Sequence, residues 1–267
     1  MVMLKKFGFS SQETKDILLA VFVLAFCFGF RWPGQLSAFG WFSSFIQSLI
    51  IVGISFFLCQ LAHKYIAFKH RATTQFRLWW SGVIAALMLC FITNGYFIWA
   101  APGALFITGL YLYRPGYVKK EVHLGLYERG KIALAGPLIF IALAILAKVL
   151  LAVPAFAVFA KKMLFINAYL AVFSMIPFVY PHNAQPALIA RGNLPQLAGV
   201  WVLYGSRLLW VFSFSFIVLC ALSLWYLSLG AALLLAFVCA AALLLLFYYY
   251  FEPWSAMTKV KKPFEYK

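Results

Sequence analysis

Residues 41–63 read WFSSFIQSLIIVGISFFLCQLAH, an apolar run that contains no Asp, Glu, Lys or Arg. About 20 such residues are enough to cross the hydrocarbon core of a bilayer as a helix, so this run predicts a membrane span. The whole chain has 267 residues, of which 66% are hydrophobic and only 10% are charged. A soluble domain needs more polar surface than this composition supplies. The sequence therefore predicts an all-α polytopic membrane protein.

The run ends in Cys59-Gln60-Leu61-Ala62-His63. Residues four apart lie on the same face of a helix, and the zinc-protease motif H-E-x-x-H uses this spacing for two metal ligands. Cys59 and His63 keep the spacing, and thiolate and imidazole both bind zinc, with Cu(I) as a less favoured ion. Gln60 stands where the motif has its general base. A carboxamide takes up no proton at neutral pH, so this route to metal-assisted hydrolysis is missing.

The segment 78–113 is apolar but interrupted at Asn94-Gly95 and Pro102-Gly103. Because basic clusters stand on both sides of it, we expect a re-entrant or short extended hairpin, with 101–107 extended rather than helical. Around it the hydropathy pattern predicts about six spans, at 15–30, 41–66, 132–153, 163–180, 198–226 and 229–251.

The formal charge of +16 comes from Lys and Arg residues in the short connections beside the apolar runs. This is the positive-inside pattern, which predicts cytoplasmic N- and C-termini and the lipid bilayer, with no nucleic acid, as the partner. None of the six acidic residues falls within an apolar run, so the sequence offers no buried catalytic carboxylate. Ser10 and Glu13 match a capping box that would start the first helix.

Three blocks resemble the site-2 protease family of intramembrane zinc metalloproteases, archaeal members above all. The first is the Cys59–His63 motif, and the second is Ala135-Gly136-Pro137-Leu138, whose small residues permit close helix approach. The third is Asn167-Ala168-Tyr169-Leu170-Ala171-Val172-Phe173-Ser174-Met175-Ile176-Pro177, which runs on to Pro181-His182-Asn183. The resemblance covers about 41–190 and implies a site-2 protease-like core there. It leaves 191–267 as a C-terminal helical pair with a basic tail, and all of 1–267 as one membrane domain.

The resemblance implies a role for each residue at a motif position. Cys59, His63 and His182 stand where the family has its zinc ligands, and Gln60 stands at the catalytic glutamate. Phe140, Ser174 and Asn183 replace an asparagine, an asparagine and a glycine of the family motifs, while Asn167 is retained. We expect these last four residues to line the groove for a substrate or partner.

Because the scaffold blocks persist while the catalytic residues differ, we expect a non-proteolytic homologue in a prokaryotic, archaeal-type cell membrane. It would bind or regulate a transmembrane segment of another membrane protein. Two alternatives stay open: an active intramembrane protease with a Cys/His/His zinc site, and a metal-binding membrane protein without a peptide substrate. A metal-free site, in which Cys59 is a core thiol and the histidines are hydrogen-bonded, is a further alternative.

Overall fold

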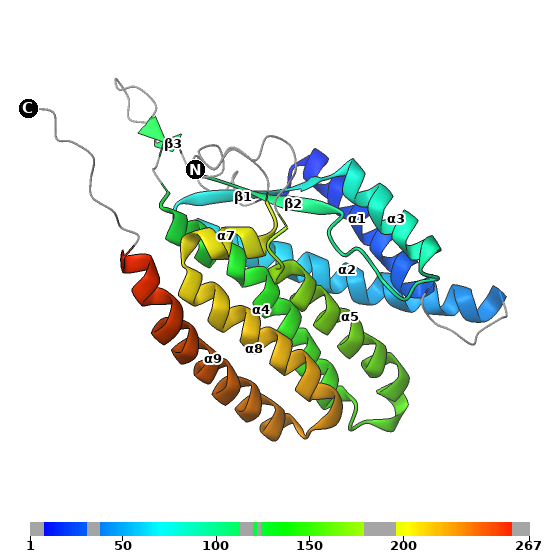
Figure 1. Ribbon diagram of the computed structural model, residues 1–267. Coiled ribbons are helices and arrows are strands. Elements are labelled where there is room, and N and C mark those ends of the chain that lie inside the picture. The colour runs from blue at the N-terminus through cyan, green and yellow to red at the C-terminus, as the bar shows by residue number, and fades with distance from the viewer. Residues whose placement is uncertain are drawn as a thin grey trace, which may run out of the picture.

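A computed structural model describes residues 8–30, 38–109, 111–112, 120–121, 124–178 and 196–257. Most of these residues are helical, and the long helices lie side by side with the paired strands β1 and β2 across them (Figure 1). The helices are α1 (Ser11–Phe30), α2 (Ala38–Lys69), α3 (Trp80–Ile92), α4 (Leu126–Leu150), α5 (Ala157–Met175), α7 (Ala198–Gly205), α8 (Arg207–Tyr226) and α9 (Leu229–Met257), with a 3-10 turn at Pro154–Phe156. The strands are β1 (Ala72–Leu78), β2 (Gly103–Gly109), β3 (Tyr111–Leu112) and β4 (Lys120–Glu121).

Five helices in the described part of the chain are long and apolar enough to cross a membrane: α2, α4, α5, α8 and α9. The remaining predicted span, 15–30, corresponds to α1, whose first two turns carry Glu13, Lys15 and Asp16 and which is not among these five. The protein is thus a polytopic helical membrane protein, as predicted. The cytoplasmic position of the termini and the division at residue 190 stay predictions.

The predicted span 198–226 is wrong in one respect, because Ser206 divides it into α7 and α8. Ser206 has extended backbone angles, φ −163° and ψ 119°, and its hydroxyl accepts the Leu209 N–H at 3.3 Å as the N-cap of α8. Gly205 ends α7, and its Cα lies against α4: an added Cβ there would be 2.8 Å from the Leu126 carbonyl oxygen. The break therefore allows the end of α7 to lie close to α4.

The prediction of a hairpin at 78–113 is confirmed in part, because β2 lies within that segment whereas its partner β1 lies almost entirely before it. β1 and β2 pair in antiparallel register from Ala72↔Gly109 to Leu78↔Gly103, so the chain leaves and re-enters at the same place. Between them α3 has 13 residues, about 20 Å of helix, which is shorter than the ~30 Å hydrocarbon core. The expected extended stretch 101–107 is largely strand β2.

The N-terminal turns of α1 hold the outer edge of β1. The predicted capping box is present, since Ser10 Oγ accepts the Glu13 N–H at 3.1 Å and Glu13 Oε2 accepts the Ser10 N–H at 3.4 Å. Glu13 Oε1 also accepts the Phe76 N–H at 3.2 Å, and Asp16 Oδ2 accepts the Leu78 N–H at 3.2 Å. Two strand N–H groups that point away from β2 thereby gain acceptors from α1.

Lys64, the residue after His63, completes this contact from α2. Its ammonium group donates to Glu13 Oε2 at 2.9 Å and to the Thr74 carbonyl at 3.1 Å. It also lies 4.6 Å from the centre of the Phe9 ring. Glu13 and Lys64 are both buried. One ion pair therefore joins α1, α2 and β1.

A second buried lysine joins helices at the other end of α2. Lys162 of α5 donates to the Ser44 hydroxyl at 2.8 Å and to the Ser44 carbonyl. The Ser44 hydroxyl in turn donates to the Gly29 carbonyl of α1 at 3.2 Å. This chain of hydrogen bonds fixes α5 against α2 and α1.

Replacing Lys162 by methionine is expected to lower the free energy of unfolding by about 2 kcal/mol, because the buried Ser44 carbonyl and hydroxyl lose a charged donor. Equilibrium unfolding in mixed micelles would measure the change. The matched control is Lys161→Met, since Lys161 is exposed one position away. Equal unfolding free energies for the two variants would contradict the assigned role.

Helix α9 is the least buried of the five long apolar helices. Only 17% of its most apolar stretch is buried. The helix packs on α8, and its fully buried residues include Ala232, Ala236 and Ala240. Small side chains let two helices approach closely in a membrane. In Figure 1 α8 and α9 lie at the edge of the molecule, on the far side of α4 from α1 and α3.

Candidate functional site

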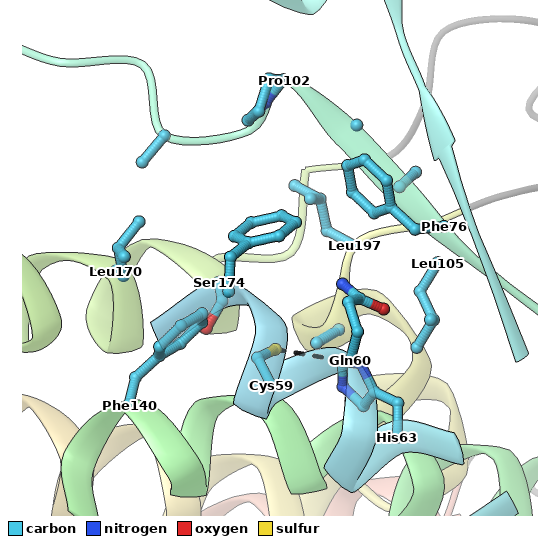
Figure 2. Close-up of a pocket in the computed structure, with 15 residues that line it drawn as sticks. Cys59, Gln60, His63, Phe76, Pro102, Leu105, Phe140, Leu170, Ser174 and Leu197 are labelled. Carbon is cyan, nitrogen blue, oxygen red and sulfur yellow. Dashed lines mark hydrogen bonds between the residues drawn. The ribbon is translucent and has the colours of Figure 1, made fainter. Parts of the chain in front are cut away.

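The last third of α2 places Cys59, Gln60 and His63 on adjoining positions of one helical turn. All three side chains are buried, each with about 4% of its surface exposed. Cys59 Sγ lies 3.9 Å from His63 Nδ1, as the dashed line in Figure 2 shows. The spacing in the sequence thus brings the two predicted ligands together.

Helix α4 covers this pair at its Gly136-Pro137 step. A Cβ added to Gly136 would lie 2.5 Å from His63 Nε2 and 2.8 Å from Cys59 Sγ, which is closer than atoms in proteins tolerate. His63 Nε2 lies 3.2 Å from the Ala133 carbonyl oxygen and 3.1 Å from the Gly136 backbone nitrogen. The small residue predicted to allow close approach therefore makes room for the two side chains themselves.

A pocket of about 70 Å³ opens beside Cys59, Gln60 and His63 (Figure 2). In this view the Gln60 carboxamide points up towards Phe76, Leu105 and Leu197. The walls come from α2, α4, α5, the two paired strands and the start of α7, and they are mostly apolar. The other lining residues are Phe56, Ala100, Pro102, Gly103, Ala104, Phe140, Leu170, Ser174 and Ala198.

The remaining predicted residues fall into three groups. Phe140 and Ser174 line the pocket, and the Ser174 hydroxyl donates to the Ala171 carbonyl at 2.9 Å. Asn167 is fully buried in α5, where its amide donates to the Met163 carbonyl at 3.0 Å, and it is not among the lining residues. His182 and Asn183 lie outside the described residues. Within the described ranges no three His, Cys, Asp or Glu side chains form a group that could hold a metal.

No family model and no solved structure matches this chain. A protein of Methanocaldococcus jannaschii named "Putative zinc metalloprotease" is 35% identical over 186 residues. The match covers 68% of this chain and 86% of that protein. The chain belongs to that protein's family. The prediction of a zinc-metalloprotease-like membrane protein is confirmed at this level, and the finer assignment to the site-2 protease family stays a prediction.

The relative's name implies zinc, and the Cys59–His63 pair fits two ligands of such an ion. With ligand bonds of about 2.3 Å to sulfur and 2.0–2.1 Å to nitrogen, two neighbouring tetrahedral ligands lie roughly 3.6 Å apart. The observed separation of 3.9 Å is close to this value. Sulfur and imidazole nitrogen are also ligand types that zinc prefers. The separation and the ligand types of the pair are therefore compatible with two of the four positions of a tetrahedral site.

A zinc metalloprotease also needs a general base that takes a proton from water. Glu13 is a buried carboxylate, but its oxygens accept from Lys64, Phe76 and Ser10 and it does not line the pocket. Sequence reasoning gave Glu13 only a capping role, because contacts with residues 51 and 63 positions away leave no local signal. The polar group at the base position is the carboxamide of Gln60.

Proposed function

We propose that this protein is a site-2 protease-like homologue that holds a transmembrane segment of another membrane protein in the Gln60 pocket without cutting it. The observation that carries this proposal is the side chain of Gln60, which is buried and lines the pocket beside the two metal-ligand types. A hydrolytic metal site needs a group that removes a proton from water, and a carboxamide cannot do so. Binding is the activity that this pocket retains.

The lining of the pocket supports an apolar occupant. Phe56, Phe76, Leu105, Phe140 and Leu170 contribute side chains from five different elements. Burying apolar side chains of a partner segment against them would be favourable, and the few polar groups would orient its backbone. A membrane-embedded segment has the matching chemistry.

Photocrosslinking tests the proposal directly. A photoreactive amino acid at position 170 or 174, inside the pocket, should crosslink to a synthetic apolar transmembrane peptide of about 20 residues in the same vesicles. The matched control is position 245 on α9, where Leu245 is exposed. The peptide should be recovered at full length by mass spectrometry. Crosslinking equal to that at position 245, or cleavage of the peptide by the unchanged sequence, would refute the proposal.

Metal binding is a second candidate function, favoured by the 3.9 Å approach of Cys59 Sγ to His63 Nδ1. Cys59 and His63 would hold the ion, and we propose His182 as a third ligand. A bound zinc would act as a Lewis acid that lowers the pKa of its water. With Gln60 beside it, the site would serve binding or structure.

Purified protein is expected to contain zinc, and Cys59→Ala and His63→Ala are each expected to lose most of it, because each change removes one of few ligands. Elemental analysis of the metal-to-protein ratio measures this. Cys239→Ala and His70→Ala, which change the same residue types outside the pocket, should keep the ratio of the parent. Absence of metal from the parent, or an unchanged ratio in both site variants, would remove this candidate.

A further inference from the structure

Pro137 lies in the interior of α4, and it has no backbone N–H. In a helix the N–H of a residue donates to the carbonyl four positions earlier, so the Ala133 carbonyl lacks its donor from residue 137. The proline ring also crowds that carbonyl and tilts it away from the helix axis. A buried acceptor therefore becomes available on the face of α4 that meets α2.

The imidazole of His63 occupies this place. Its Nε2 lies 3.2 Å from the Ala133 oxygen, and both residues are buried. A buried carbonyl that finds no donor costs about 1–3 kcal/mol. A proton on Nε2 would satisfy the Ala133 carbonyl at a normal hydrogen-bond distance.

The same ring nitrogen also lies 3.1 Å from the Gly136 backbone nitrogen, which would instead require Nε2 to be an acceptor. The two arrangements differ in what they leave unsatisfied. The Gly136 N–H has the Ile132 carbonyl four residues earlier as its regular helical acceptor, whereas proline denies Ala133 its regular donor. Only the tautomer with the proton on Nε2 gives every one of these groups a partner.

We infer that Pro137 positions His63: it leaves the Ala133 carbonyl to hold the ring through Nε2–H, and so turns an unprotonated Nδ1 towards Cys59 Sγ. This inference deepens the metal-binding candidate for the same pocket. A metal-ligating histidine commonly donates its second ring N–H to a backbone carbonyl, which fixes the ring and its tautomer. The metal-binding atom of His63 is therefore Nδ1, and Gly136-Pro137 has two tasks, making room for the pair and orienting it.

The tautomer can be measured on the metal-free protein, with no partner segment present. Nitrogen-15 NMR of ring-labelled histidine distinguishes a proton on Nε2 from one on Nδ1, and comparison with His63→Gln assigns the signal among the four histidines. We expect the proton on Nε2. A proton on Nδ1 in the unchanged sequence would overturn the inference, whatever any variant does.

The variant Pro137→Ala restores an N–H at residue 137 that competes for the Ala133 carbonyl. We expect it to shift His63 towards the Nδ1–H form and to weaken zinc binding about 10–100-fold, as loss of a ligand's hydrogen-bond partner does. The matched control is Pro154→Ala, at an exposed first position of a 3-10 turn, where no helical hydrogen bond is lost. An unchanged tautomer in Pro137→Ala would also overturn the inference.

These outcomes are separate from the proposed holding function. Crosslinking at position 170 reports a bound segment whatever the tautomer of His63 is, and the NMR signal needs no segment. Failure of one experiment therefore leaves the other result standing.

Discussion

Replacing Glu13 by glutamine is expected to lower the free energy of unfolding by about 3–5 kcal/mol, the usual cost of breaking a buried ion pair by removing one partner. The buried Lys64 ammonium would then face a neutral amide oxygen in place of the carboxylate, beside the Thr74 carbonyl and the Phe9 ring. The Phe76 N–H would lose a charged acceptor as well. We expect both the hairpin and the pocket wall formed by Phe76 to loosen, and equilibrium unfolding in mixed micelles measures the loss of stability.

Two further variants show whether charge burial is the cause. Glu128→Gln changes the same residue type at an exposed cap, where Oε2 accepts only the Gly125 N–H, and it should cost less than about 1 kcal/mol. The double variant Glu13→Gln with Lys64→Met removes both charges and should be more stable than Glu13→Gln alone. A double variant that is less stable than the single one would contradict the explanation.

Changing Gln60 to glutamate is expected to create cleavage of transmembrane peptides in zinc-loaded protein. A positioned general base typically contributes about 10²–10⁴ in rate, and the only group exchanged here is the carboxamide at the base position. The readout is release of peptide fragments in vesicles, followed by mass spectrometry with and without added chelator. Chelator should abolish the new activity.

The matched control is Gln75→Glu, which makes the same change on the exposed side of β1. Gln60→Ala should also show no cleavage, because it removes the amide without adding a base. If Gln60→Glu binds zinc as the parent does and still cuts nothing, the missing base is not what prevents hydrolysis. The absence of proteolysis would then require a different explanation.

Hydropathy was sufficient to predict α2, α4, α5 and α9 as spans, because a run such as 41–63 has one stable solution in a bilayer. The i, i+4 spacing likewise predicted that Cys59 and His63 meet. The partner of Lys64 was beyond sequence reasoning, since Glu13 lies 51 positions earlier and only folding brings them together. The same holds for the contact at Pro137, because the use of the Ala133 carbonyl by His63 depends on how α2 packs on α4.

The break at Ser206 is a different kind of miss. Gly205-Ser206 is a stop-and-start signal, since glycine favours helix ends and serine favours N-caps. The apolar pattern continues across both residues, and it was read as one span of 198–226. A local signal was therefore present but outweighed by hydropathy. His182 and Asn183 remain predictions on which the described residues give no information.

The two buried lysines also bear on how the chain is made. Glu13 precedes Lys64, and Ser44 precedes Lys162, so each acceptor leaves the ribosome before the ammonium group that needs it. A lone lysine at membrane depth costs about 2.5–3.5 kcal/mol during insertion. Because its acceptor is already synthesised, each ammonium group has a hydrogen-bond partner available as its helix enters, so the order of synthesis favours the assembly of this protein.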